Sequence, residues 1–448
     1  MVKARVKFVC QQCGAAFPKW TGKCDNCGAW NSLLESVPEI EGKSVVARSA
    51  GKSLTAQKLS DIKLDAISDR ISTGIADLDM VFGGGLMPGG VVLVAGQPGI
   101  GKSTLLLQVA AAIASRGNVL YVSGEESASQ VKLRAERLGA KNSESLSLAS
   151  TTNADDVAAT IAGGQFRLVI VDSMQTMAMN EIASAPGTVS QITNSANIII
   201  RAAKTTNTAV LLVGHVTKEG SIAGPKVLEH VVDVVINFEG DRYGGFKLVR
   251  AIKNRYGSTS EVAIFDMTDR GLEIVENPSA ALLAERHDSD GSVVLATMEG
   301  NRPLLVEIQA LVNPTSFGYA KRAASGFDPN RLTLLIAVLE RRTKLNLSDK
   351  DIFVNVVGGL KLADRAADLA VCMAIASAAA ERKLRDGAVV FGEVGLGGEI
   401  RSATSSDKRI AEAKKLGFTY AVAPKSAAKD KFVVSAVDLR DALNQHLK

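Results

Sequence analysis

The stretch G96-Q-P-G-I-G-K-S-T104 decides the fold of this chain. It follows an apolar run of strand length, V91-V-L-V-A95, and it opens an apolar, alanine-rich stretch of helical composition that reaches Ala114. In such a strand–loop–helix context the glycines let backbone amides curl around phosphate, and the helix N-terminus adds a positive dipole end. The stretch therefore predicts a nucleotide-binding P-loop made of Gly96, Gln97, Pro98, Gly99, Ile100, Gly101, Lys102, Ser103 and Thr104.

The P-loop assigns expected roles to two of its own side chains and to one acidic residue further on. Lys102 is expected to hold the β- and γ-phosphates of ATP, and Ser103 to bind Mg²⁺. The run R167-L-V-I-V-D172 is an apolar strand that ends in an acid. Asp172 could be a helix cap alone, but together with a P-loop it is predicted to reach the Mg²⁺ shell.

Two further strand ends carry candidate catalytic groups. Y121-V-S-G-E-E-S127 ends in two carboxylates, either of which can act as general base toward the attacking water or merely favour a helix N-terminus. Glu125 is preferred over Glu126 because it lies nearer the strand end. L211-L-V-G-H-V-T217 places His215 where a γ-phosphate would lie, which leaves a sensing role and a structural role both open.

The four clustered cysteines form two pairs, C10-Q-Q-C13 and C24-D-N-C27, each followed by a glycine. Paired CxxC knuckles are typical of closed, tetrahedral zinc sites, so the predicted zinc ligands are Cys10, Cys13, Cys24 and Cys27. Iron in a rubredoxin-like site remains an alternative with the same ligands. The fifth cysteine, Cys372, lies in an alanine-rich stretch and is expected to be a core thiol.

The composition is that of an ordinary globular protein of two or three domains: 448 residues, 46% hydrophobic and 22% charged. The net charge of +5 permits a nucleic-acid partner without requiring one, and 4% aromatic residues disfavour aromatic stacking as the main binding mode. Residues 1–10 contain no apolar h-region of a signal peptide, and apolar runs such as 91–95 and 168–171 are strand-sized, well short of a membrane span. We therefore expect a cytoplasmic protein with reduced thiols and no membrane partner.

Apolar runs and alanine-rich stretches alternate between residues 57 and 275, which predicts a parallel sheet wrapped by helices. Strands are expected at 91–96, 119–123, 168–172, 210–214 and 231–237. The predicted domains are a zinc knuckle, a linker, a P-loop ATPase domain, a second linker and a C-terminal α/β domain, at 1–33, 34–56, 57–275, 276–290 and 291–448.

The P-loop, G124-E-E-S127, V213-G-H-V-T217 and K253-N-R-Y-G257 in this order resemble the RadA/Sms family of RecA-like bacterial recombination factors. The four-cysteine knuckle and the C-terminal domain extend the resemblance over essentially the whole chain; the family has Phe where this chain has Tyr256. The resemblance implies a DNA-dependent ATPase and helicase that processes branched recombination intermediates. It also implies a hexameric ring around single-stranded DNA, with recombinase or replication-helicase partners at the knuckle.

Within such a ring, Lys253 and Arg255 would reach the γ-phosphate held by the adjoining subunit, as an arginine finger does. They are two residues apart, so on an extended segment both side chains leave from one face; the alternative is a solvated basic turn. The resemblance also points to DNA contacts in the loops Q175–Q191 and T217–K226. Lys218 and Lys226 are the candidate phosphate contacts there.

The C-terminal part resembles the proteolytic domain of Lon proteases. By that resemblance Ala366 takes the position of the nucleophilic Ser, and Asp407 that of the Lys base. An alanine cannot attack a peptide bond, and no Ser lies between residues 363 and 371, so a Ser–Lys protease is not expected. A ring-forming scaffold is expected instead, whose segments 321–322 and 341–344 either bind duplex DNA or are solvated.

The combined prediction is a RecA-like P-loop ATPase core with a small N-terminal zinc knuckle and a Lon-protease-like α/β domain, using ATP, Mg²⁺ and Zn²⁺. Its expected function is DNA-dependent ATP hydrolysis in recombination and repair, as a hexameric translocase on single-stranded and branched DNA. The alternatives are an ATP switch or scaffold that does not translocate, an ATP-dependent protease, and a strand-exchange recombinase that forms open filaments.

Overall fold

The computed structural model describes residues 7–10, 15–36, 58, 69–139, 144–215, 227–240, 245–316, 318–427 and 429–447. The chain divides into two compact units, Met1–Ser68 and Asp69–Lys448. The first unit contains a three-stranded antiparallel sheet in the order β2-β1-β3, built from β1 (Lys7–Cys10), β2 (Ala16–Phe17) and β3 (Leu33–Ser36). Strand β3 continues past the predicted knuckle boundary at residue 33.

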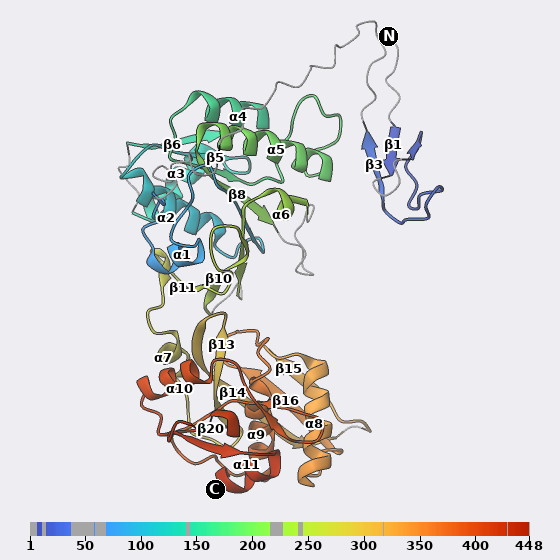
Figure 1. The fold of residues 1–448 in the computed structure, drawn as a ribbon, viewed down its shortest axis with the longest axis vertical. Coiled ribbons are helices and arrows are strands. Elements are labelled where there is room, and N and C mark those ends of the chain that lie inside the picture. Colours follow the sequence, from blue (N-terminus) through green and yellow to red (C-terminus); the bar gives the residue numbers. More distant parts are fainter. Residues whose placement is uncertain are drawn as a thin grey trace, which may run out of the picture. The chain divides into compact units, whose positions relative to one another are not determined.

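The second unit contains a nine-stranded sheet in the order β12-β11-β10-β9-β4-β8-β7-β5-β6. Figure 1 labels β5, β6, β8, β10 and β11 of this sheet. Its six parallel strands confirm the predicted parallel sheet; they are β4 (Val91–Gly96), β5 (Val119–Ser123), β6 (Leu146–Ser150), β7 (Leu168–Asp172), β8 (Ala209–His215) and β9 (Val234–Glu239). Successive side chains of a strand leave from opposite faces. In β4, accordingly, Val92 and Val94 join one core cluster, and Val91 and Leu93 join another.

Helices cover both faces of this sheet. The first cluster is completed by α1 (Ala76–Val81), α2 (Lys102–Ala114) and α3 (Ala128–Arg137), and the second by α4 (Ala154–Gly163), α5 (Val189–Thr206) and α6 (Val227–Val231). Side-chain caps fix where two of them begin. Ser127 and Gln130 form a reciprocal capping box at α3, and the Thr188 hydroxyl accepts from the Gln191 amide at α5.

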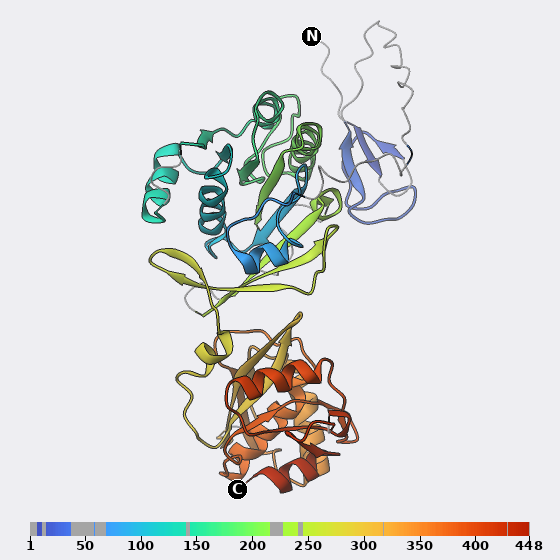
Figure 2. The ribbon, with the colours of Figure 1, turned by 60° about the vertical axis from the view of Figure 1, so that its left-hand side comes forward.

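Two features of the sheet differ from the sequence-based expectation. The predicted strand at 231–237 is wrong at its start, since Val231 ends α6 and β9 begins at Val234. The reason is Asp233, a buried carboxylate that accepts a hydrogen bond from the Val91 amide and so interrupts the apolar run. The sheet also continues beyond β9 in antiparallel strands, seen in yellow-green in Figure 2: β10 (Lys247–Asn254), β11 (Val262–Thr268) and β12 (Gly271–Ile274).

Residues 276–290 were expected as a linker, but they include α7 (Pro278–Leu283), whose Leu282 is buried in the core of the C-terminal part. Leu248 of β10 and Ile264 of β11 belong to the same core. Strands β10 and β11 therefore contribute to two cores, because Val249 and Phe265, the neighbours of these residues along the strands, join the core of the nine-stranded sheet instead.

The C-terminal sheet has seven strands in the order β15-β16-β14-β13-β17-β20-β21. They are β13 (Ser292–Glu299), β14 (Arg302–Pro314), β15 (Arg322–Ser325), β16 (Lys350–Val356), β17 (Ala388–Val390), β20 (Tyr420–Pro424) and β21 (Val433–Ala436). The helices are α8 (Pro329–Thr343), α9 (Ala367–Ala380), α10 (Ser406–Lys415) and α11 (Leu439–His446). Helix α9 is buried over most of its length, as expected of a helix apolar on every side.

Cys372 lies in α9 and is fully buried, which confirms that it is a core thiol; burial raises the pKa of this thiol well above its usual value. Among the described helices, none combines the length and the apolar character needed to cross a bilayer.

Candidate active site

Four of the predicted site residues, Lys102, Glu125, Asp172 and His215, lie at one edge of the parallel sheet. Strands β4, β8, β7 and β5 are consecutive neighbours, and their carboxyl ends lie side by side. In the register of these pairs Gly96 is opposite His215, and Ser123 is opposite Asp172. Ligands of open α/β sheets bind outside the carboxyl ends of the strands. Residues far apart in the sequence are thus brought together where a nucleotide is expected.

The P-loop has the geometry that its glycines predict. A Cβ at Gly96 would lie 2.7 Å from the Cβ of Phe238, and Gly101, with φ +116°, forms the N-cap of α2. Lys102 is buried, and its Nζ donates to the carbonyl oxygens of Gly96 and Gln97, at 2.9 and 3.0 Å. Lys102 is thus folded back onto its own loop. The oxygens of a bound phosphate would replace these two carbonyl oxygens as acceptors.

His215 links Lys102, the predicted phosphate ligand, to the candidate base Glu125. Its Nδ1 lies 3.3 Å from Lys102 Nζ, and its Nε2 lies 3.1 Å from Glu125 Oε1. An ammonium group has only donors, so Nδ1 is the acceptor and the ring proton resides on Nε2, facing the carboxylate. The imidazole therefore joins the two groups, a link that the sequence does not reveal.

The structure separates the two candidate carboxylates. Glu125 accepts hydrogen bonds from His215 and from the Ser173 hydroxyl, whereas Glu126 is paired with Arg134 of α3. Burial acts to raise the pKa of Glu125, but the donors Ser173 and His215 outweigh it and hold that pKa below its usual value. Ser173 was missed from the sequence; the only signal for it was a hydroxyl residue directly after the acid that ends β7.

Asp172 is buried at the end of β7, and its Oδ2 accepts a hydrogen bond of 2.7 Å from the Tyr121 hydroxyl. Burial, followed by the neighbouring Asp172 carboxylate, strongly raises the pKa of Tyr121, so the phenol stays a neutral donor. A carboxylate oxygen and the Ser103 hydroxyl are hard oxygen donors of the type that Mg²⁺ prefers. The donor set at this edge therefore fits magnesium, with Tyr121 as an orienting residue that the sequence did not indicate.

Lys253 and Arg255 do not join this group. Lys253 Nζ donates to the carbonyl oxygens of Glu229 and Val232 at the end of α6, at 2.6 and 2.7 Å. Arg255 Nη1 lies 3.1 Å from Asp233 Oδ1. Both side chains thus reach the same short segment, as expected for residues that leave one face.

That segment lies at the opposite end of the sheet from the P-loop. Asp233 Oδ2 accepts from the amide of Val91, the first residue of β4, at 3.0 Å, whereas the P-loop follows the last residue of that strand. Strand residues rise by about 3.3 Å, so roughly 16 Å of strand separates the two ends. Lys253 and Arg255 are therefore too far away to serve the P-loop of their own chain.

Burial and hydrogen bonding shift the pKa values of Asp233 and Lys253. Burial acts to raise the pKa of Asp233, but donors that include the Val91 amide and Lys204 lower it overall. Burial, and then the nearby Arg255, lower the pKa of Lys253. Asp233 is thus an ionised anchor for Arg255, whose side chain stays 55% exposed.

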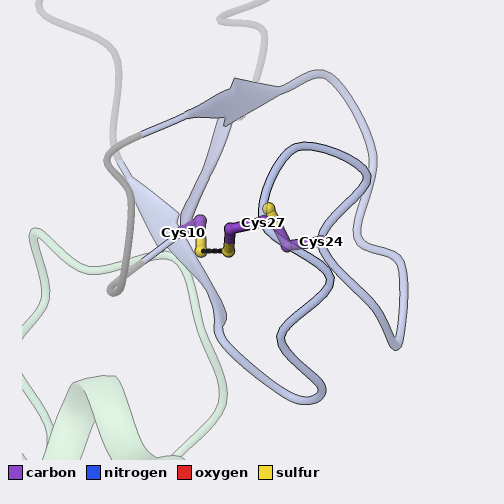
Figure 3. Close-up of side chains that lie close together, drawn as sticks. All are labelled: Cys10, Cys24 and Cys27. Atoms are coloured by element: carbon purple, nitrogen blue, oxygen red, sulfur yellow. Dashed lines mark hydrogen bonds between the residues drawn. The ribbon is translucent and has the colours of Figure 1, made fainter.

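In the first unit three cysteine sulfurs converge, as Figure 3 shows for Cys10, Cys24 and Cys27. Their Sγ atoms all lie within 4.8 Å of one another, and those of Cys10 and Cys27 are 3.6 Å apart. Thiolates on one tetrahedral zinc, each at about 2.3 Å, would be roughly 3.8 Å apart, whereas a disulfide would bring the sulfurs to about 2.05 Å. The spacing fits a shared metal. The fourth predicted ligand, Cys13, lies outside the described residues.

The candidate DNA contacts Lys218 and Lys226 lie outside the described residues, so the structure does not place them. In the loop 175–191, the side-chain amide nitrogen of Gln191, Nε2, donates to the carbonyl oxygens of Met179, Ile182 and Ser184. These bonds hold the loop against α5, because Gln191 lies in that helix. Ala366 is buried at the N-terminus of α9, and Asp407 is exposed in the first turn of α10.

The fold and the site define a P-loop ATPase of RecA-like architecture with an N-terminal metal-binding ribbon. Two family models match, an AAA domain over residues 56–221 and a rubredoxin metal-binding domain over residues 8–35. The curated DNA repair protein RadA of Pseudomonas aeruginosa is 45% identical, over 99% of both chains. Its Streptococcus pyogenes counterpart is 47% identical over 95% of this chain and 94% of that one, and the Aquifex aeolicus protein 46% over 95% of each. The chain belongs to this family, the DNA repair protein RadA family.

Proposed function

We propose that this chain is a DNA-dependent ATPase of DNA repair and recombination that works as a hexameric ring translocase on single-stranded DNA. The observation that carries the proposal is the division of one catalytic set between the two ends of the sheet. Lys102, Glu125, Asp172 and His215 lie at one end, and the cations that a phosphoryl-transfer site needs lie at the other. A ring of identical subunits would place the second end of one subunit against the first end of the next.

The chemistry proposed is attack of water on the γ-phosphate of ATP. Lys102 would exchange its hydrogen bonds to Gly96 and Gln97 for bonds to the β- and γ-phosphates. Ser103 and Asp172 would hold Mg²⁺, which when bound supplies charge neutralisation between the phosphates. Glu125 would accept the proton of the attacking water.

His215 has a positioning role in this scheme. When Lys102 turns to the phosphates, the acceptor Nδ1 loses its partner and the imidazole can rotate. The Glu125 carboxylate then loses one of the two donors that depress its basicity. Arrival of the γ-phosphate would thus be coupled to activation of the base.

The proposal is tested by ATP hydrolysis with and without single-stranded DNA, for the wild type, Lys102→Ala, Arg255→Ala and a mixture of the two variants. The expected result is stimulation by DNA, loss of activity in each variant alone, and partial recovery on mixing, because the intact P-loop of one variant meets the intact Arg255 of the other. An Arg255→Ala variant with wild-type activity would refute the shared site. Stimulation without displacement of an annealed strand would instead support an ATP switch that does not translocate.

A further inference from the structure

The metal-binding ribbon exposes both tryptophans of the chain. The sequence contains only two, Trp20 and Trp30, and their exposed fractions are 55% and 72%. Indole rings bury a large area in cores and interfaces, so two open rings on one small module are unusual for a purely structural knuckle. They identify a surface that is built to contact something else.

The backbone holds the two rings together. Lys23 and Trp30 form an antiparallel bridge, and the Asn31 amide donates to the carbonyl oxygen of Gly22 at 2.8 Å. A side chain at Gly22 would meet both rings, since its Cβ would lie 3.9 Å from a ring atom of Trp20 and 3.9 Å from one of Trp30. The absence of a side chain at position 22 therefore leaves space beside two pre-positioned aromatic surfaces.

The charges around the rings are positive. Lys23 Nζ lies 5.7 Å from the centroid of the Trp30 ring, and the exposed Lys19 directly precedes Trp20. Residues 1–33 carry five basic side chains and one acidic side chain, Asp25. Lysine is depleted at protein–protein interfaces, whereas lysines beside stacking rings are typical of surfaces that bind single-stranded nucleic acid.

We propose that the face formed by Lys19, Trp20, Lys23 and Trp30 binds single-stranded DNA. Bases stack on the two indole rings, and the lysines contact the phosphates between them. This ribbon face would give the strand a contact separate from the ATPase core. The choice of DNA as the ligand rests on the proposed function, whereas the face itself rests on the exposed rings and their charge.

The test uses the intrinsic fluorescence of the full chain, which comes from this face because both tryptophans lie on it. The zinc-loaded wild type is titrated with oligo(dT) without nucleotide, and total binding is followed in parallel by anisotropy of a labelled oligo(dT). We expect saturable quenching of the tryptophan emission with the same midpoint as the anisotropy, shifting to higher concentration as salt is raised.

Three variants sharpen the result. Trp20→Ala with Trp30→Ala should weaken oligo(dT) binding by about 10-fold or more, since each stacked base contributes substantially. Trp20→Phe with Trp30→Phe should keep most of the affinity, because the rings remain. Leu34→Ala removes another exposed apolar side chain of the ribbon, 44% exposed, and should bind like the wild type. Equal zinc contents in all variants would show that the ribbon is folded.

The outcomes separate this inference from the proposed function. Oligo(dT) binding by anisotropy without quenching, or with wild-type affinity in the double alanine variant, would overturn the ribbon face as a DNA site and assign it to a protein partner, while leaving the ATPase proposal intact. Failure to bind oligo(dT) at all, with or without ATP, would overturn both.

Discussion

The imidazole of His215 accepts a hydrogen bond from Lys102, with 3.3 Å between Nδ1 and Nζ. The same ring donates from Nε2 to Glu125, so a single side chain connects the group expected to bind phosphate with the group expected to activate water. Replacing His215 should therefore affect catalysis more than nucleotide binding, because Lys102 and the rest of the P-loop are unchanged in the variant.

We expect His215→Ala to lower kcat by roughly 10²-fold, because small misplacements of catalytic groups have effects of this size. The KM for ATP should change little. His215→Gln offers both an acceptor and a donor, and it should recover part of the lost rate. Steady-state hydrolysis in the presence of DNA measures these effects. Equal activities of His215→Ala and the wild type would rule out the coupling.

The two neighbouring carboxylates should behave differently. Glu125→Gln removes the proposed base, and kcat should fall by about 10²- to 10⁴-fold while ATP still binds. Glu126→Gln is the matched control, because Glu126 pairs with Arg134, whereas Glu125 accepts from His215 and Ser173. A partly exposed pair of this kind is worth about 1 kcal/mol or less, so this variant should lose little stability and little activity. A reversed order of the two effects would make Glu126 the base.

The sequence predicted the parts of the site that depend on local pattern, and it missed those that depend on spatial neighbours. The P-loop, the strand ends at Asp172 and His215, and the metal-binding knuckle each follow from a short run with its own spacing. Tyr121 and Ser173 carry no such signal, because their roles arise only when β5 and β7 pair. The antiparallel strands β10 to β12 were also missed, since their apolar residues are divided between the core of the nine-stranded sheet and the core of the C-terminal sheet, whose residues follow later in the chain.

Asp233 should be needed for Arg255 to act in the neighbouring site. Its carboxylate accepts from the Val91 amide, Lys204 and Arg255, and it is nearly inaccessible to solvent. We expect Asp233→Asn to lower DNA-stimulated hydrolysis as Arg255→Ala does, and to be partly rescued by mixing with Lys102→Ala. Lys204→Met is the control, because it removes another cation from Asp233 and leaves Lys253 and Arg255 unchanged. Absence of rescue, alongside rescue of Arg255→Ala, would limit Asp233 to a structural role.

The same carboxylate makes stability depend on pH. The pKa of Asp233 is lowered in the folded chain, so its stabilising contribution is present above its unfolded pKa of about 3.9 and is lost as the pH falls through the folded value. At pH 7 the Asp233→Asn variant should be less stable by about 2 kcal/mol, as expected for hydrogen bonds to a charged group. The difference between variant and wild type should shrink below about pH 4. Thermal unfolding across this pH range measures it, and a constant difference would contradict the assignment.

The ribbon should hold one metal ion per chain through its cysteine sulfurs. The separation of 3.6 Å between Cys10 and Cys27 Sγ fits thiolates that share an ion, and the ring of protein ligands leaves no open position for catalysis once Cys13 joins them. Elemental analysis should find about one zinc per chain, and none in a Cys24→Ser, Cys27→Ser variant. Cys372→Ser is the control, because this buried thiol lies in α9, outside the cluster, and its replacement should leave the metal content unchanged.

Absorption spectroscopy distinguishes the two candidate metals. Iron bound to thiolates absorbs in the visible range and zinc does not, so a coloured protein would replace the zinc assignment with a rubredoxin-like iron site. A colourless protein without zinc would show that the cysteines do not form a metal site.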